Sequence, residues 1–162
     1  MSSSNLNGML AQYLLLEKYS PQMQWGKKFY PDFFGYSFDI AGGIAAGASA
    51  SANINVASDG SFIITDLAGT LLTANTVLAA FGSQEFENVT IQITDSGSGR
   101  NFFDRPIPFN HLFGQGGGNR YQLPVPKIVQ NNATLTCTLT NNGAVAVTRV
   151  YGTFFGVKTL SR

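Results

Sequence analysis

Short segments in which apolar and polar residues alternate recur along this chain from residue 33 onward. The clearest cover 89–94 and 134–139, where valine, isoleucine, leucine and cysteine alternate with threonine and glutamine. A period of two places the apolar side chains on one face of a strand and the hydroxyl or amide groups on the other, as a strand covered on one side by a second sheet requires. We therefore predict strands at both places.

Further segments have the length and composition of strands and are bounded by Gly, Asn, Asp and Pro. About eight strands of this kind predict an all-β fold, an antiparallel sandwich of the jelly-roll type. Turns are expected at 58–60, 95–99 and 141–143, and the Asn-Gly pair in the last is a hairpin signal because it tolerates the positive φ of a tight turn. The remaining predicted strands are 34–40, 49–56, 60–67, 100–104, 123–129 and 144–156.

Two segments are open to more than one interpretation. Residues 68–82 carry small apolar residues with little alternation, which fits a helix or a long connection. Residues 41–52 are low in complexity and rich in glycine and alanine, which favours a surface loop. The alternative for 41–52 is a strand that packs tightly between chains.

The first 32 residues lack the alternation and are predicted to form an arm that precedes a single sandwich domain, 33–162. Apolar residues between 6 and 14 recur at helical spacing, so a short amphipathic helix is expected near 6–18. Large aromatic residues follow, of the kind that anchors interfaces because they bury much area with few rotamers to freeze. We expect the arm to dock, either on a partner or on its own domain. The residues predicted to make this contact are Leu6, Met9, Leu10, Tyr13, Leu14, Trp25, Phe29 and Tyr30.

The composition narrows the partner classes. Charged residues form 12% of the chain and the net charge is +1, too little to neutralise many phosphates, so nucleic-acid binding is not expected. A lightly charged, nearly neutral surface is typical of proteins that lie against another surface, which favours a homo-oligomer or a larger assembly. Cys137 is the single cysteine, which fits a reducing cytoplasm. The apolar run 9–16 is too short to span a bilayer, so no membrane contact is expected.

No motif in the sequence predicts catalysis, a cofactor or a metal ion. His111 is the single histidine and has no nucleophile elbow near it, so neither a zinc site nor a catalytic triad is expected. The glycine-rich stretch 114–120 lacks the Lys-Ser/Thr of a phosphate-binding loop. The stretch 95–100 has one carboxylate, too few for calcium, and is better explained as a turn between strands.

The region from Val89 to Lys158 resembles a pattern found in structural proteins of tailed bacteriophages. The resemblance rests on the strand 89–94 with its turn to Arg100, the paired prolines of 105–108 and 123–126, the glycine-rich 113–118, and the threonine-rich strand 133–142. In that family, such segments imply a compact β-sandwich on the capsid exterior or between capsomers, with a terminal arm that reaches a neighbour. The first 88 residues show no motif of the family.

The hypothesis that follows is a non-enzymatic virion protein, a capsid decoration or cement protein that binds the major capsid protein and copies of itself on the capsid exterior after synthesis in the host cytoplasm. The alternative is a carbohydrate- or receptor-binding module of a phage tail fibre, with Phe102, Phe103, Phe109 and Phe113 as a ring platform unless those rings fill the core. A third interpretation, the coat protein of a small jelly-roll virus, is disfavoured because the arm is not strongly basic.

Overall fold

The computed structural model describes residues 29–73, 88–113 and 120–161. Most of these residues are in β-strands, and one five-residue helix, α3 (Phe109–Phe113), is present. The strands are β1 (Phe29–Ile40), β2 (Ser49–Asn55), β3 (Gly60–Thr73), β4 (Val89–Asp95), β5 (Arg100–Asn101), β6 (Ile107–Pro108), β7 (Tyr121–Val129), β8 (Thr134–Asn141) and β9 (Val147–Ser161).

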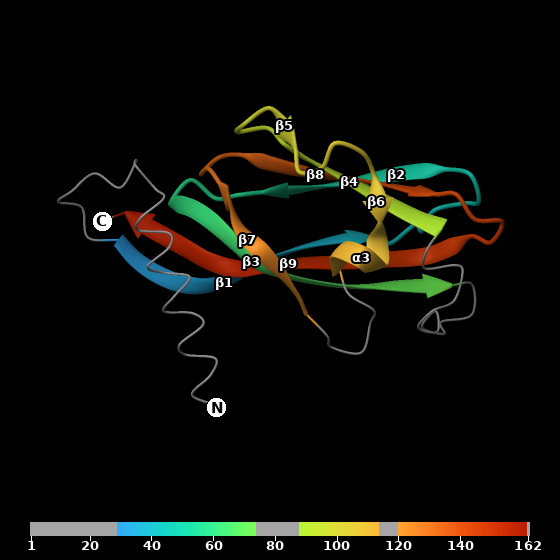
Figure 1. Ribbon diagram of the computed structural model, residues 1–162, viewed down its shortest axis with the longest axis horizontal. Coiled ribbons are helices and arrows are strands. Elements are labelled where there is room, and N and C mark those ends of the chain that lie inside the picture. The colour runs from blue at the N-terminus through green and yellow to red at the C-terminus, as the bar shows by residue number, and fades with distance from the viewer. Residues whose placement is uncertain (1–28, 74–87, 114–119, 162) are drawn as a thin grey trace.

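The strands form two antiparallel sheets that lie face to face (Figure 1). One sheet has the order β1-β9-β3-β7, and the other has the order β2-β8-β4-β5 with β6 also paired to β4. The pairs are nested: β1 with β9, β2 with β8, β3 with β7, and β4 with β5 and β6. Nested pairs that alternate between two sheets are what one long hairpin produces when it rolls up, so the predicted jelly-roll sandwich is confirmed.

The core lies between the inward faces of the two sheets. On β8, Leu135, Cys137 and Leu139 are fully buried, as their alternation with threonine predicts. On β4, Val89, Ile91 and Ile93 are fully buried in the same way. Both of these strand predictions are thus confirmed, in their position along the chain and in the side chains that face the core.

Several strands differ in extent from the sequence prediction. β1 begins at Phe29, so the last four residues of the predicted arm pair with β9. β3 continues to Thr73, which makes 68–73 a strand, while 74–87 lie outside the described residues. β9 starts at Val147 and runs to Ser161, and the strand predicted at 100–104 ends at Asn101.

The hairpin predicted at 141–143 is wrong. β8 and β9 belong to different sheets and do not pair, so the turn between them is a corner rather than a hairpin. Here the Asn141 amide group donates hydrogen bonds to the carbonyls of Ile44 and Val145, and its side-chain oxygen accepts one from the Gly143 amide. The side chain of Asn141 therefore links three segments of this corner.

The low-complexity segment 41–52 is only in part a loop. Residues 49–52 belong to the edge strand β2, and 41–48 form the corner that leads from β1 to β2. At Gly43, φ is +68° and an added Cβ would overlap the Val147 carbonyl, so glycine is required at this corner. Whether another chain contacts β2 stays a prediction.

Candidate docking surface on the outer face of the sandwich

The predicted contact residues of the arm lie mainly outside the described part of the chain. Leu6, Met9, Leu10, Tyr13, Leu14 and Trp25 are all in residues 1–28. Phe29 and Tyr30 are placed by their backbones, which pair with Ser161 and Leu160 of β9 at the start of β1. The predicted docking of the arm therefore stays a hypothesis.

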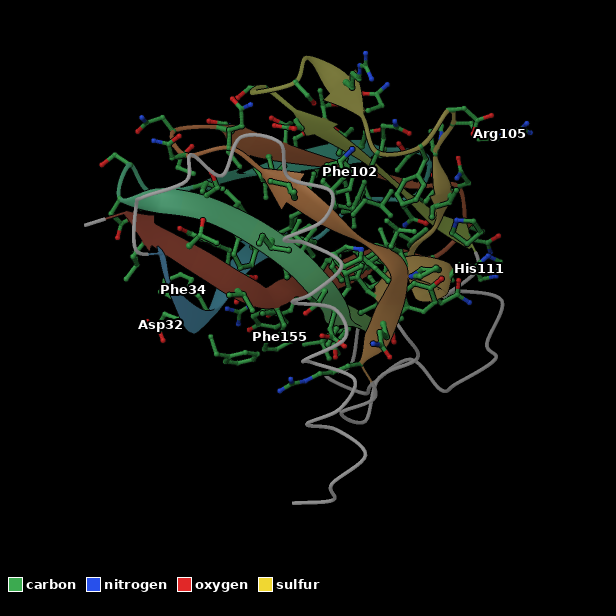
Figure 2. All side chains as sticks on the ribbon, turned by 60° about the vertical axis from the view of Figure 1, so that its left-hand side comes forward. Asp32, Phe34, Phe102, Arg105, His111 and Phe155 are labelled. Carbon is green, nitrogen blue, oxygen red and sulfur yellow. The ribbon has the colours of Figure 1, made fainter. Side chains whose placement is uncertain are left out.

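Two of the positions that the sequence analysis weighed for chemistry, His111 and Asp95, lie among the described residues. The described part of the chain contains no cluster of three or more His, Cys, Asp or Glu side chains that could hold a metal ion. His111 is exposed on α3, at the rim of the molecule in Figure 2. Asp95 is buried, and its carboxylate accepts hydrogen bonds from the Gly97 amide and the Ser98 hydroxyl. These bonds make 95–98 a turn, as predicted.

No helix in the described part of the chain is long and apolar enough to cross a membrane.

Two of the four phenylalanines considered as a sugar platform belong to the core, and the other two pack against it. Phe109 and Phe113 are fully buried on α3 and stack on each other, with 4.7 Å between ring centroids. Phe102 and Phe103 are half-buried and pack against the core cluster. The core explanation is therefore correct for Phe109 and Phe113, whereas Phe102 and Phe103 lie at the margin of the core.

One end of the outer face of the β1-β9-β3-β7 sheet is apolar. Strand register places Phe33 opposite Val157, Val157 opposite Ile63, and Ile63 opposite Ile128, so one row of apolar side chains crosses all four strands. The neighbours Phe62, Ile64 and Val129 are fully buried in the core, so this row lies on the opposite side of the sheet. Phe33 is 56% exposed and Ile128 is 42% exposed. Together with Phe155 we call this row the apolar end of the outer face.

An arginine stacks on this apolar end. Phe155 lies on the side of β9 that faces away from the second sheet (Figure 2), and its ring stacks with Phe33 at 6.3 Å. The Arg120 guanidinium lies 4.1 Å from the Phe155 ring centroid and 5.9 Å from that of Phe33. No carboxylate of the described residues forms an ion pair with Arg120. The cation is therefore held by rings and keeps its donors for other contacts.

The opposite end of the same face is polar, and its charged groups are paired with each other. Arg149 donates two hydrogen bonds to Asp39, at 3.0 and 2.7 Å, and lies over the Tyr151 ring at 4.4 Å. The hydrogen bonds from Arg149 lower the pKa of Asp39, and the Asp39 carboxylate raises the pKa of Arg149. With both groups paired, this end offers fewer free donors than the apolar end.

The outer face of the second sheet has a different character. Side chains on β2 and β8 bond in cross-strand pairs: Ser49 with Thr140, Ser51 with Thr138, and two further pairs between asparagine and threonine, all at 2.8 to 3.0 Å. Hydroxyl and amide groups that hydrogen-bond to one another offer a partner neither apolar surface area nor an unpaired charge. The two outer faces are thus unequal, and only the β1-β9-β3-β7 face carries an apolar end.

The edge strand β7 is shaped to resist pairing with other strands. Its register against β3 jumps from Ile64↔Lys127 to Asp66↔Gln122, so the four residues 123–126 oppose a single residue of β3. Pro124 and Pro126 lie in this bulge, and Val125 between them is 77% exposed. Bulges and prolines are common means of blunting an exposed sheet edge.

Sequence reasoning missed the apolar end, although a signal was present. Doublets of apolar residues within strands, Phe33-Phe34, Ile63-Ile64 and Phe154-Phe155, break the period of two. In a sandwich, such a doublet places one side chain in the core and the other on the outer face. The doublets belong to neighbouring strands, which only the register reveals.

Comparison with known proteins identifies no relative. No family model matches the sequence, and no curated protein matches it. One solved structure, the crystal structure of Yersinia pseudotuberculosis-derived mitogen, aligns over 81% of this chain and 87% of its own, with 12% identity and a TM-score of 0.26. A likeness at this level carries no argument for fold or function.

Proposed function

We propose that this protein is a non-enzymatic structural component of a tailed-phage virion, a decoration or cement protein that binds the major capsid protein on the exterior of the shell and stabilises it. The observation that carries the proposal is the inequality of the two outer faces of the jelly roll, one with an apolar, arginine-bearing end and the other with self-satisfied hydroxyl groups. Such inequality is typical of a protein that lies with one side against a larger surface. Because residues 89–158 resemble phage structural proteins, we propose that this larger surface is the exterior of a capsid.

The mechanism in this proposal is mechanical. A protein that binds the closed shell and not its separate parts stabilises the shell by linkage, as any ligand selective for one state does. Many copies, each with modest apolar contact, act together through avidity. Copies of the chain that contact one another on the shell would strengthen this effect.

Quantitative mass spectrometry of purified particles tests the proposal. We expect this chain at a high ratio to the major capsid protein, whereas a few copies per particle would indicate a tail location, and absence would overturn the proposal. Rebinding to stripped shells then tests the surface. A Phe33→Ser, Ile128→Ser variant should bind less well, and a Thr136→Ser, Thr138→Ser variant on the opposite face should bind like the parent.

The alternative, a carbohydrate- or receptor-binding module of a tail fibre, loses two of its four platform rings because Phe109 and Phe113 are fully buried. It remains a proposal on the jelly-roll architecture alone, which also occurs in lectins. A glycan array with the purified protein tests it, and binding that a core-preserving variant such as Phe33→Ser abolishes would favour it over the shell role.

A further inference from the structure

We propose that the side of the sandwich formed by the edge strands β1 and β2 binds a second copy of this chain. In this dimer β1 pairs antiparallel with β1 of the partner subunit, about a two-fold axis near Tyr36, and the first sheet continues across the interface. The inference does not rest on the virion role, because it concerns the isolated protein. It names the surface through which two copies of the chain would contact each other.

β1 is an edge strand without the usual protection against pairing. Among the described residues it pairs only with β9, so every second residue directs its backbone N–H and C=O groups away from the sheet. Its register with β9 is continuous over all 12 residues, without a bulge. The stretch 32–40 contains no proline, lysine or arginine, and most of its side chains are exposed. This edge can therefore accept a further strand.

The edges on the opposite side of the sandwich are protected. β7 carries the bulge with Pro124 and Pro126, and β5, at the end of the second sheet, has only 2 residues. Bulges, prolines and short strands each hinder the addition of another strand at an edge. We therefore assign self-association to the β1 side, where these features are missing from the described stretch 32–40.

Charge is distributed in the same way. Arg100, Arg120 and Lys127 form no ion pair with the described residues, and all three lie on or next to β5 and β7. β1 and β2 carry no lysine or arginine, and the Asp39 carboxylate of β1 is paired with Arg149. Unpaired cations keep a sheet edge in water, whereas the centre of a protein interface is depleted of charge. The β1–β2 side thus has the composition expected of an interface.

A two-fold axis at Tyr36 lets the whole stretch 32–40 pair with its own copy. Asp32 then lies opposite Ile40 of the partner subunit, and the two copies of Asp32 are about 27 Å apart at ~3.4 Å per residue, well beyond the Debye length at physiological salt. Phe34, which is 37% exposed, lies opposite Phe38 of the partner subunit on the core side of the sheet. The pairing therefore places no two carboxylates opposite each other and covers an exposed ring.

β2 enlarges the contact. The Tyr36 hydroxyl accepts a hydrogen bond from the Ala57 amide, just after β2, so the two edge strands lie on one side of the sandwich. The stretch 32–40 is about 27 Å long, and two sheets ~10 Å apart with their side chains make this side about 20 Å deep, which gives roughly 500 Å². Specific interfaces bury about 600 Å² or more on each partner. We therefore expect a reversible dimer whose population rises with protein concentration.

Sedimentation equilibrium of the full-length protein, with a charge introduced at Ser37, tests the inference. Ser37 is exposed on β1 beside the proposed axis, and in the dimer it lies ~7 Å from its own copy, diagonally across the two strands. Ser37→Lys should weaken dimerisation about fivefold, because two like charges meet, and Ser37→Asp should do the same. An equal mixture of the two variants should recover heterodimers, seen by native mass spectrometry, which also shows that both variants fold.

Thr94→Lys is the matched control. Like Ser37, Thr94 is exposed and its hydroxyl makes a cross-strand hydrogen bond, at 2.8 Å to Asn101, but it lies on β4, which β8 separates from β2. We expect this variant to dimerise like the parent. Equal weakening by both lysine variants, a dimer that neither weakens, or a parent that stays monomeric at its highest soluble concentration would overturn the inference, as would a mixture without heterodimers.

Hydrogen exchange gives a readout that needs no substitution. Amide exchange in 32–40 should slow as the protein concentration rises into the dimer range, because the edge N–H groups of β1 become hydrogen-bonded, whereas exchange in 121–126 of β7 should stay the same. Slowing at β7 instead of β1 would place the contact on the opposite side and overturn the inference. The virion proposal would stand or fall separately on particle composition.

Discussion

Gly69 on β3 and Gly152 on β9 lie directly opposite each other on the inner side of the sheet, and phenylalanine side chains of the core, Phe113 among them, occupy the space that their missing side chains leave. A Cβ added at either glycine would lie 2.9 Å from a Phe113 carbon. The same ring makes edge contacts with Phe38 and Phe154, at 5.6 and 5.5 Å between centroids. The pair of glycines therefore makes room for the aromatic centre of the core.

Replacing Gly152 with alanine should destabilise the fold. The new methyl group would overlap the Phe38 ring, which cannot move freely within the packed core. Overpacking of this kind costs about 1 to 3 kcal/mol. Urea denaturation followed by tryptophan fluorescence or circular dichroism would show the lower midpoint.

Gly35→Ala is the matched control for that variant. Gly35 lies on β1, where an added Cβ would make ordinary contacts of 3.5 Å or longer. Because alanine also restricts the unfolded chain, we expect a change between zero and a gain of about 1 kcal/mol. Equal destabilisation by both variants would contradict the role assigned to the aromatic centre.

We expect the free energy of unfolding to fall in acid, in part because Asp59 becomes protonated. Lys158 is 5% exposed and its Nζ forms an ion pair with Asp59, which lowers the pKa of Asp59 below 3.8 and raises the pKa of Lys158 above 10.5. A lowered carboxyl pKa contributes stability that is present above pH 3.8 and lost as the pH falls through the folded value. A raised lysine pKa contributes stability that is lost as the pH rises past 10.5.

The measurement is the urea midpoint between pH 2 and pH 7, compared between the parent and an Asp59→Asn variant. We expect the variant to be less stable near neutral pH and to lose less on acidification. Asp32→Asn, an exposed carboxylate outside the three ion pairs of the described residues, serves as the control. An unchanged acid slope in Asp59→Asn would contradict the prediction.

Cys137 should be unreactive in the folded protein. The side chain is fully buried on β8, and burial raises the pKa of its thiol to about 12. Because the thiolate is the reactive species, labelling by a disulfide reagent at pH 8 should proceed only as fast as the protein opens. Rapid labelling without denaturant, at the rate found in guanidinium, would refute the burial of this strand.

Removing the two prolines of the β7 bulge should promote self-association. Pro124→Thr with Pro126→Thr gives this edge backbone donors and strand-forming side chains where the parent has neither. We expect a larger sedimentation coefficient or light-scattering signal at high concentration. Pro106→Thr, outside the bulge, should leave the association state unchanged, and a similar rise in both variants would argue against an edge-specific effect.

Much of the fold was predictable because the period of two is a local property. The alternation in 89–94 and 134–139 was sufficient to place two strands and to assign their buried faces, since each side chain's direction follows from its neighbours. The jelly-roll class followed from the number and spacing of such segments. The expectation of a non-enzymatic role, which rests on residue types alone, stays a prediction.

Other features depended on contacts between distant residues. The turn at 141–143 carries a hairpin sequence, yet it joins two sheets, because Asn141 bonds to Ile44 almost a hundred residues earlier in the chain. The start of β1 at Phe29 is set by pairing with the end of β9, which no local pattern reveals.

The sequence by itself determined which residues alternate, and therefore the class of fold and most of the core. The tertiary structure decided which strands are neighbours, and through register it assembled Phe33, Val157, Ile63 and Ile128 into one row. The physical reason is that side-chain facing depends on a residue's immediate neighbours, whereas a surface depends on which strands pair. The candidate docking surface belongs to the second kind, so it became visible only once the sheets were formed.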